Sequence, residues 1–586
     1  MPDRVPPSIS NLPQEILEII TSNLSTKALA QCVRVNHYWS SLFMPQLWKT
    51  IQIRNRTDYN KFNNHDTLKA LLRNCHSIHT LHTCNIKWIW ALASMTTRCR
   101  NLRSLTLVRD HNALSVSSEL VTLPPGDLDA SFARQAICVS SALPILLKQN
   151  RRLQHVKIEG FIFHPKAGCR ALGYILRSLP TQSLDRLEIK CKSFLTPRSP
   201  ADDIDPAVFQ DGEEGDAQED DRPYALKELA LSGRIESTDS LFAFLKRCPR
   251  LESLTLHSVS DVPFDQLSTL LQKYCPLLSR LQWKTDNSTE GDAEIANLLD
   301  ASNSNSQDGG GWKSIQLPFM NGFGPLSTQA LQRHASTLTQ VSANGWGSLT
   351  SSDVQALLCS APRLQNLNGQ LMIDVTSDYR VSEMVLHAQD LMHSSASWAG
   401  TSSLKHLRLV IDDIPRLDVK CDHMGRPFLR PLPATPSHTS SLQVQESVCK
   451  QLGAMIELRT LVLGRPDINT SGTIVRADEF GQLHPALRSL AREQQYQCLE
   501  LSLSSGLGWM SELKELKTLD VTRMAHRIGV AELEWMHLNW PKLETIDGLF
   551  SQRLWEGHGN SDWEGSEAVQ DWMEAHPLGV GSSFYH

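Results

Sequence analysis

The chain has 586 residues, of which 20% are charged, and its formal net charge is −6. This weakly acidic balance gives no reason to expect a nucleic-acid partner. No apolar run approaches the roughly 18–20 residues that a membrane span needs, and residues 1–10 lack the apolar core of a signal peptide. We therefore expect a cytoplasmic or nuclear protein with no membrane contact, and a disordered N-terminus over residues 1–10.

Residues 11–54 are predicted to form three short helices followed by a strand. Pro13 suits the first turn of a helix, and Glu15 lies near the positive end of that helix. The apolar face of this first helix carries Ile16, Ile20 and Leu24. Because so short a segment cannot bury a core of its own, its apolar side chains either contact a partner or pack on the rest of the chain.

The second and third helices follow directly. Ser25 or Thr26 can cap the second helix, and helical spacing continues until Pro45 is expected to break it. The apolar residues of this stretch are Leu29, Cys32, Val33, Val35, Trp39 and Leu42. Ile51 and Ile53 then alternate with polar residues, which indicates a short strand.

The order and spacing of these apolar residues resemble the F-box. The polar run Asn36-His37-Tyr38 departs from the family pattern, in which many members carry Cys or Ser and then Lys or Arg. The resemblance implies docking onto the Skp-type adaptor of a Skp–cullin–F-box ubiquitin ligase, with cullin reached through the adaptor. The residues that the resemblance assigns to this contact are Leu12, Pro13, Glu15, Ile16, Ile20, Leu24, Leu29, Cys32, Val35 and Trp39.

Residues 55–550 repeat the motif L-x-x-L-x-L, with 25 residues between Leu226 and Leu251. This period is typical of leucine-rich repeats, in which about 20–29 residues form one strand and one helix. Strong copies include Leu102/Leu105/Leu107, Leu251/Leu254/Leu256, Leu404/Leu407/Leu409 and Leu516/Leu519/Val521; weaker ones include Ile78/Leu81, Leu338/Val341 and Leu364/Leu367. We predict an α/β solenoid (horseshoe) with parallel strands on the concave face and helices on the convex face.

Four cysteines precede repeat copies at one equivalent position: Cys75, Cys99, Cys248 and Cys275. No CxxC pair is present, so we interpret these thiols as small buried hydrophobes and expect no metal and no cofactor. The units that begin Cys-Pro at Cys248 and Cys275 also resemble the cysteine-containing subtype of F-box leucine-rich-repeat proteins.

Polar segments interrupt the repeat. We expect disordered insertions near residues 199–223, 285–311 and 418–445, because these segments are rich in acidic, Ser, Gly or Pro residues. Residues 551–586 are predicted to be a C-terminal cap and tail, with helical character from Ser566 to His576.

No catalytic motif is present, so we expect a non-catalytic subunit. The hypothesis is a substrate-recognition adaptor of a Skp–cullin–F-box ligase, whose repeats bind an unknown protein substrate for ubiquitination and proteasomal degradation. The alternative is a scaffold or regulatory binding protein that delivers no substrate. The register of the repeats places these candidates on the concave face: Arg103, Thr106, Glu252, Thr255, Gln282, Lys405, Arg408 and Arg459. The sequence leaves open the substrate and any dependence on phosphorylation.

Overall fold

The protein is represented by a computed structural model. It describes residues 12–53, 65–84, 89, 92–94, 99–108, 142–161, 175–191, 222–232, 238–257, 262–284, 291–302, 310–317, 323–343, 349–369, 372–373, 381–382, 384–393, 397–416, 419–421, 427–429, 436–464, 497–522, 524–549 and 566–576. The chain divides into two compact units. Unit 1 comprises Met1–Val262 and Tyr274–Pro276, and unit 2 comprises Pro263–Lys273 and Leu277–His586.

Three helices begin unit 1: α1 (Gln14–Ser22), α2 (Thr26–Val33) and α3 (His37–Lys49). Ser25 caps α2, since its hydroxyl accepts a hydrogen bond from the Ala28 N–H at 3.2 Å. The expected break at Pro45 is wrong, because α3 continues through this residue to Lys49. Proline costs the helix one backbone hydrogen bond. The packing of Trp39 against the buried Phe43, with ring centroids 5.4 Å apart, offsets this cost.

A parallel sheet forms the rest of unit 1, and each strand pairs with the next one along the chain. Its strands are β1 (Thr50–Gln52), β2 (Thr80–Thr83), β3 (Ser104–Val108), β4 (His155–Phe161), β5 (Arg186–Cys191), β6 (Glu228–Ser232) and β7 (Ser253–His257). The helices here include α5 (His65–Asn74), η2 (Cys75–Ser77) and α9 (Thr238–Leu245).

Unit 2 repeats this arrangement. Its parallel strands, in sheet order, are β8 (Arg280–Lys284), β9 (Ser314–Leu317), β10 (Gln340–Ala343), β11 (Asn366–Asn368), β15 (His406–Arg408), β19 (Thr460–Val462), β20 (Thr518–Asp520) and β21 (Thr545–Asp547). Its helices are α10 (Phe264–Tyr274, whose last residue belongs to unit 1), α11 (Asp292–Leu299), α12 (Pro325–Arg333), α13 (Ser351–Ser360), α14 (Ala388–His393), α15 (Pro436–Gly453), α17 (Val530–Asn539) and α18 (Ser566–Ala575), with the short turns η5 (Ala399–Ser402), η7 (Leu503–Ser505) and η8 (Leu507–Met510).

Three further strand pairs lie outside the main sheet of unit 2. The pairs β12 (Met372–Ile373) with β13 (Val381–Ser382) and β17 (Val419–Cys421) with β18 (Pro427–Leu429) are antiparallel. The pair β14 (Val385–His387) with β16 (Val410–Asp412) is parallel.

One backbone geometry recurs in both units. Two consecutive N–H groups donate to a single carbonyl of the preceding repeat: those of Glu252 and Ser253 reach the Lys227 oxygen at 2.8 and 3.0 Å. In unit 2 the N–H groups of Arg459 and Thr460 reach the Lys405 oxygen at the same two distances. The predicted leucine-rich-repeat fold is therefore confirmed, and even its weaker copies form strands.

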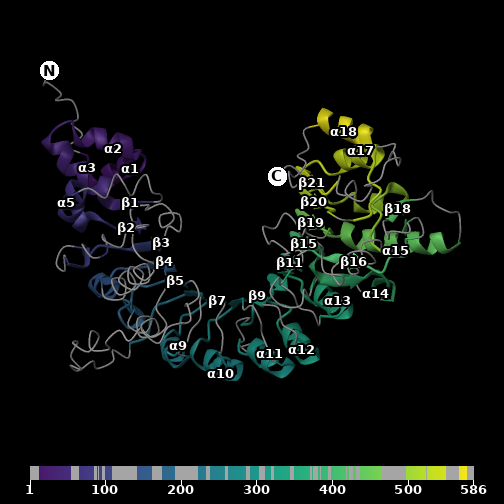
Figure 1. The fold of residues 1–586 in the computed structure, drawn as a ribbon, viewed down its shortest axis with the longest axis horizontal. Coiled ribbons are helices and arrows are strands. Elements are labelled where there is room, and N and C mark those ends of the chain that lie inside the picture. The colour runs from purple at the N-terminus through teal and green to yellow at the C-terminus, as the bar shows by residue number, and fades with distance from the viewer. Residues whose placement is uncertain are drawn as a thin grey trace, which may run out of the picture. The chain divides into compact units, whose positions relative to one another are not determined.

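The apolar residues of each motif form the core, as the fully buried Leu251, Leu254 and Leu256 illustrate. In each unit the helices of the repeats lie on one side of the strands, and α1 to α3 lie at the β1 end of the sheet (Figure 1). The alternate strand residues point away from the core, and we call the surface that they form the open face of each unit.

Two of the expected insertions contain regular structure. Within 285–311, residues 292–299 form α11, because Ile295, Leu298 and Leu299 recur at helical spacing and are buried. Within 418–445, β17, β18 and the start of α15 are formed, and Ser441 is buried. The predictions for residues 1–10, 199–221, 551–565 and 577–586 lie outside the described residues, whereas α18 occupies the helix predicted near the C-terminus.

Candidate functional site

The three N-terminal helices leave large apolar side chains exposed. Ile16 and Tyr38 are each 42% exposed, and Ile19 and Val35 reach 58% and 59%. Leu17, Leu29 and Phe43, in contrast, are buried. Because water contact with such side chains is unfavourable, these helices provide apolar surface that a partner can cover.

The residues that the F-box resemblance selected fall into three groups. Pro13, Glu15, Ile16 and Val35 are exposed, and Leu12, Ile20, Leu24, Cys32 and Trp39 are half-buried. Leu29 differs, since it is only 7% exposed and contributes to the interior of the helical segment instead. Sequence reasoning missed Ile19 and Tyr38, although Ile19 follows Ile16 by three residues and could have been found from helical spacing.

Charged side chains of opposite sign cover the open face over β4, β5 and β6. We call this set the charged ladder; it comprises Lys157, Glu159, Arg186, Glu188, Lys190 and Glu228. Glu188 lies at its centre, with one carboxylate oxygen 2.7 Å from the Lys190 Nζ and 3.4 Å from the Lys157 Nζ. Burial raises the pKa of Glu188, but the bonds and charges of Lys190 and Lys157 outweigh burial and lower it overall.

Strand register shows which of the predicted unit 1 residues lie together. Thr106, Lys157, Glu188, Ala230 and Thr255 follow one another in a single row across β3 to β7. Two predicted residues, Thr106 and Thr255, thus flank the charged ladder, which sequence reasoning missed. Arg103 and Glu252 lie immediately before β3 and β7. Register with the other repeat copies could have identified Lys157 and Glu188.

The open face of unit 2 has amide groups at one end. Gln282, predicted from the sequence, donates from Nε2 to the Gln316 Oε1 at 2.5 Å. The same row continues through Ser342, Asn368 and Arg408 to Val462 and the aspartates of β20 and β21. Neutral hydrogen-bonding groups therefore precede the charged part of this face.

The other three predicted residues form a group around β15 and β19. We call Lys405, Arg408 and Arg459 the basic cluster. The Arg459 N–H donates to the Lys405 oxygen at 2.8 Å, so these two residues lie side by side, directly before β19 and β15. Between them, His406 Nδ1 is 3.1 Å from the Thr460 Oγ1. Burial lowers the pKa of His406, and the positive charges of Arg459 and Lys405 lower it further.

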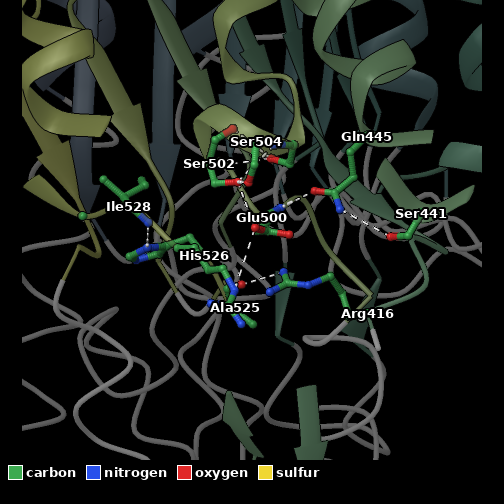
Figure 2. A network of polar contacts seen from close by, with 12 residues as sticks. Arg416, Ser441, Gln445, Glu500, Ser502, Ser504, Ala525, His526 and Ile528 are labelled. Atoms are coloured by element: carbon green, nitrogen blue, oxygen red, sulfur yellow. Dashed lines mark hydrogen bonds and ion pairs between the residues drawn. The ribbon is translucent and has the colours of Figure 1, made fainter. Parts of the chain in front are cut away.

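A buried polar network links non-repeat segments of unit 2 (Figure 2). Its centre is Glu500, which is 1% exposed and accepts a hydrogen bond from the Ser502 Oγ at 2.8 Å. The Glu500 N–H donates to the Gln445 Oε1 at 2.8 Å, and the Arg416 Nη1 donates to the Ala525 oxygen at 2.6 Å. These bonds connect α15 with the segments on either side of β20.

This network is a structural feature rather than a reaction site, because its titratable groups are sealed from solvent. His526 is fully buried, and burial lowers its pKa to about 4. The nearby positive charge of Arg416 lowers the pKa further, whereas backbone groups of Gly548 and Leu549 oppose the shift. A substrate has no route to such side chains without local opening of the unit.

The four repeat cysteines are buried, and burial raises the pKa of the Cys99 and Cys275 thiols to about 12. These thiols remain protonated and therefore pack as small apolar groups, as predicted. Across the described ranges, no group of three or more His, Cys, Asp or Glu side chains could hold a metal ion. None of the helices described here is long and apolar enough to cross a membrane.

Comparison with known proteins identifies the N-terminal segment. Residues 9–54 match the family described as F-box-like. No curated protein matches the chain. The chain therefore carries an F-box-like segment that is followed by leucine-rich repeats.

Two solved structures are similar to the chain at low identity. A leucine-rich-repeat protein of Leptospira interrogans is 13% identical, with a TM-score of 0.27, over 82% of this chain and 98% of that one. A chain of the yeast Rad7–Elc1 complex is 16% identical, with a TM-score of 0.26, over 60% of this chain and 87% of that one. At such TM-scores neither likeness bears on function, and the strand pairing described above establishes the fold.

Proposed function

We propose that this protein is the substrate-recognition subunit of a Skp–cullin–F-box ubiquitin ligase. The observation that carries the proposal is the F-box-like segment, whose helices leave Ile16, Ile19, Val35 and Tyr38 exposed. Apolar side chains of this kind act as binding hot spots when a partner removes them from water. The partner is a Skp-type adaptor, which connects the chain to cullin.

In this role the chain contributes position rather than chemistry. A conjugating enzyme elsewhere in the ligase carries ubiquitin, and the chain holds a protein substrate within its reach. Such tethering raises the effective concentration of a substrate lysine near the reactive thioester. The open faces of the repeats are the substrate-binding surfaces, because the alternate strand residues project there while their neighbours form the core.

Adaptor binding is tested with the double variant Ile16→Ala/Val35→Ala in the full chain. Both side chains are exposed, so their removal should leave the free protein folded. We expect the Kd for a purified Skp-type adaptor to rise at least roughly 10-fold, measured by calorimetry. The matched control is Leu538→Ala on α17, which is 78% exposed outside the F-box-like segment and should leave the Kd unchanged. A Kd within twofold of the native value in the double variant would refute the docking assignment.

The same double variant separates a ligase subunit from a scaffold. It retains the repeats but loses the adaptor, so it should capture substrate without directing its ubiquitination. Proteins that co-purify with it should also become more abundant in cells in which it replaces the native chain. If the abundance of every captured protein stays constant, the chain is a scaffold that delivers no substrate.

A further inference from the structure

The basic cluster concentrates positive charge around β15 and β19 of unit 2. Arg408 lies on the open face, and Lys405 and Arg459 lie directly before the two strands. Its strands β15 and β19 pair in parallel, with His406 opposite Thr460 and Arg408 opposite Val462. Lys405 and Arg459 precede these strands at equivalent positions. Adjacent strands lie about 4.8 Å apart, so the two cations are close neighbours. Figure 1 shows β11, β15 and β19 next to one another.

Within the described part of the chain, no ion pair joins Lys405, Arg408 or Arg459 to a carboxylate. The next cation along this edge behaves differently, since the Lys517 Nζ lies 2.7 Å from the Glu544 carboxylate. Glu515 is near Arg459, but its carboxylate oxygens accept from the Lys542 Nζ at 2.5 and 2.7 Å. Like charges on adjacent strands cost stability, so the cluster carries a cost that an anionic ligand would remove.

Neutral hydrogen-bonding side chains border the cluster. Asn366 and Asn368 of β11 lie opposite His406 and Arg408, and Thr518 of β20 lies opposite Thr460. Amides and hydroxyls of this kind can bond the backbone and side chains of a bound peptide.

Two carboxylates limit the extent of the cluster. Asp520 of β20 and Asp547 of β21 lie opposite each other. Asp520 also lies opposite Val462 of β19, which in turn lies opposite Arg408 of β15. Negative charge at this side repels an acidic ligand. The surface that attracts such a ligand therefore extends over β11, β15 and β19 and ends at β20.

We propose that the basic cluster binds an acidic stretch of a protein substrate, a run of Asp and Glu residues in extended conformation. Cations spread over neighbouring strands match several carboxylates along a peptide better than one compact phosphate. The guanidinium groups of Arg408 and Arg459 suit this partner, because they bind carboxylates in a bidentate manner. The description of this peptide as part of a ubiquitination substrate rests on the proposed function; the binding itself does not.

The test measures fluorescence anisotropy of a labelled Asp/Glu-rich peptide with the full chain. We expect Lys405→Gln/Arg459→Gln to weaken binding roughly 10-fold, and higher salt to weaken native binding steadily. The matched control is Lys157→Gln, which removes a cation from the open face of unit 1 and should change the affinity less than twofold. A thermal unfolding midpoint equal to that of the native chain shows that the double variant is folded.

Three results would overturn the proposal: equal affinity in the native and Lys405→Gln/Arg459→Gln proteins, equal affinity for the Asn/Gln version of the peptide, or tighter binding of an otherwise neutral peptide with one phosphoserine. The Ile16→Ala/Val35→Ala variant separates this inference from the proposed function. It should keep the peptide affinity of the native chain while it loses the adaptor. If this variant keeps both adaptor binding and peptide binding, the docking assignment is refuted but the peptide site is not.

Discussion

The open faces of the two units differ in how their charges are arranged. On β4 to β6 of unit 1, Glu188 lies between Lys157 and Lys190, so opposite charges compensate one another. Directly before β15 and β19 of unit 2, Lys405 and Arg459 are adjacent like charges. The same repeat backbone supports both surfaces. Charges on the first surface thus compensate one another, whereas no described carboxylate forms an ion pair with the cations of the second.

The largest effect should come from the core that both faces share. Leu254 and Leu461 are fully buried at equivalent positions of β7 and β19. Either Leu→Ala change should lower the free energy of unfolding of its unit by about 3 kcal/mol, because it removes buried methyl groups and leaves a cavity. Urea denaturation measures the loss, with the exposed Leu538→Ala as control. Clearly unequal losses in the free energy of unfolding would show that one unit depends more on its repeat core than the other.

Acid should destabilise unit 2 through its buried network. His526 has a pKa of about 4 in the folded protein and an ordinary value of 6.5. Below pH 6.5 the unfolded chain therefore binds a proton that the folded chain refuses, and stability falls until about pH 4. This group should cost about 2 kcal/mol between pH 7 and pH 5. Urea unfolding of the native chain and of His526→Gln, each at pH 7 and pH 5, isolates the contribution of His526. An equal pH dependence of stability in the two proteins would contradict this assignment.

Removal of the central carboxylate should destabilise unit 1. Glu188→Gln leaves Lys157 and Lys190 close together without a counter-charge, and the side chain is only 10% exposed. We expect a loss of about 1–2 kcal/mol in the free energy of unfolding. Glu228→Gln is the matched control on the next strand, where the side chain is 38% exposed and the expected loss is below about 0.5 kcal/mol. Equal losses in Glu188→Gln and Glu228→Gln would show that Glu188 stabilises the charged ladder no more than Glu228 does.

The smallest effect on stability belongs to the basic cluster. Lys405→Gln/Arg459→Gln removes adjacent like charges, so the free energy of unfolding should stay within about 0.5 kcal/mol of the native value or rise slightly. Thermal unfolding at low and moderate salt measures the change. A loss above about 1 kcal/mol would show that these cations stabilise unit 2, as the ladder does in unit 1.

Several features were visible in the sequence because their signal is local. The helices α1 to α3, the Ser25 cap of α2 and the strands of the repeats follow from spacing within a few residues. The weak copy Leu338/Val341 forms β10 as the strong copies do. Other local interpretations were wrong for tertiary reasons: α3 continues through Pro45, and α11 forms within a polar segment because neighbouring repeats bury Ile295 and Leu298.

Local spacing was enough to find the F-box-like segment, the repeat and the outward position of Arg408 on β15. Periodicity alone fixes these features, because alternate residues of a strand always point to opposite faces. Which charges meet depends on the tertiary fold. Lys157 and Glu188 come from different repeats, and their contact depends on the register of β4 against β5. The buried environment of His526 likewise arises only when distant segments pack together, since burial is a property of the folded chain.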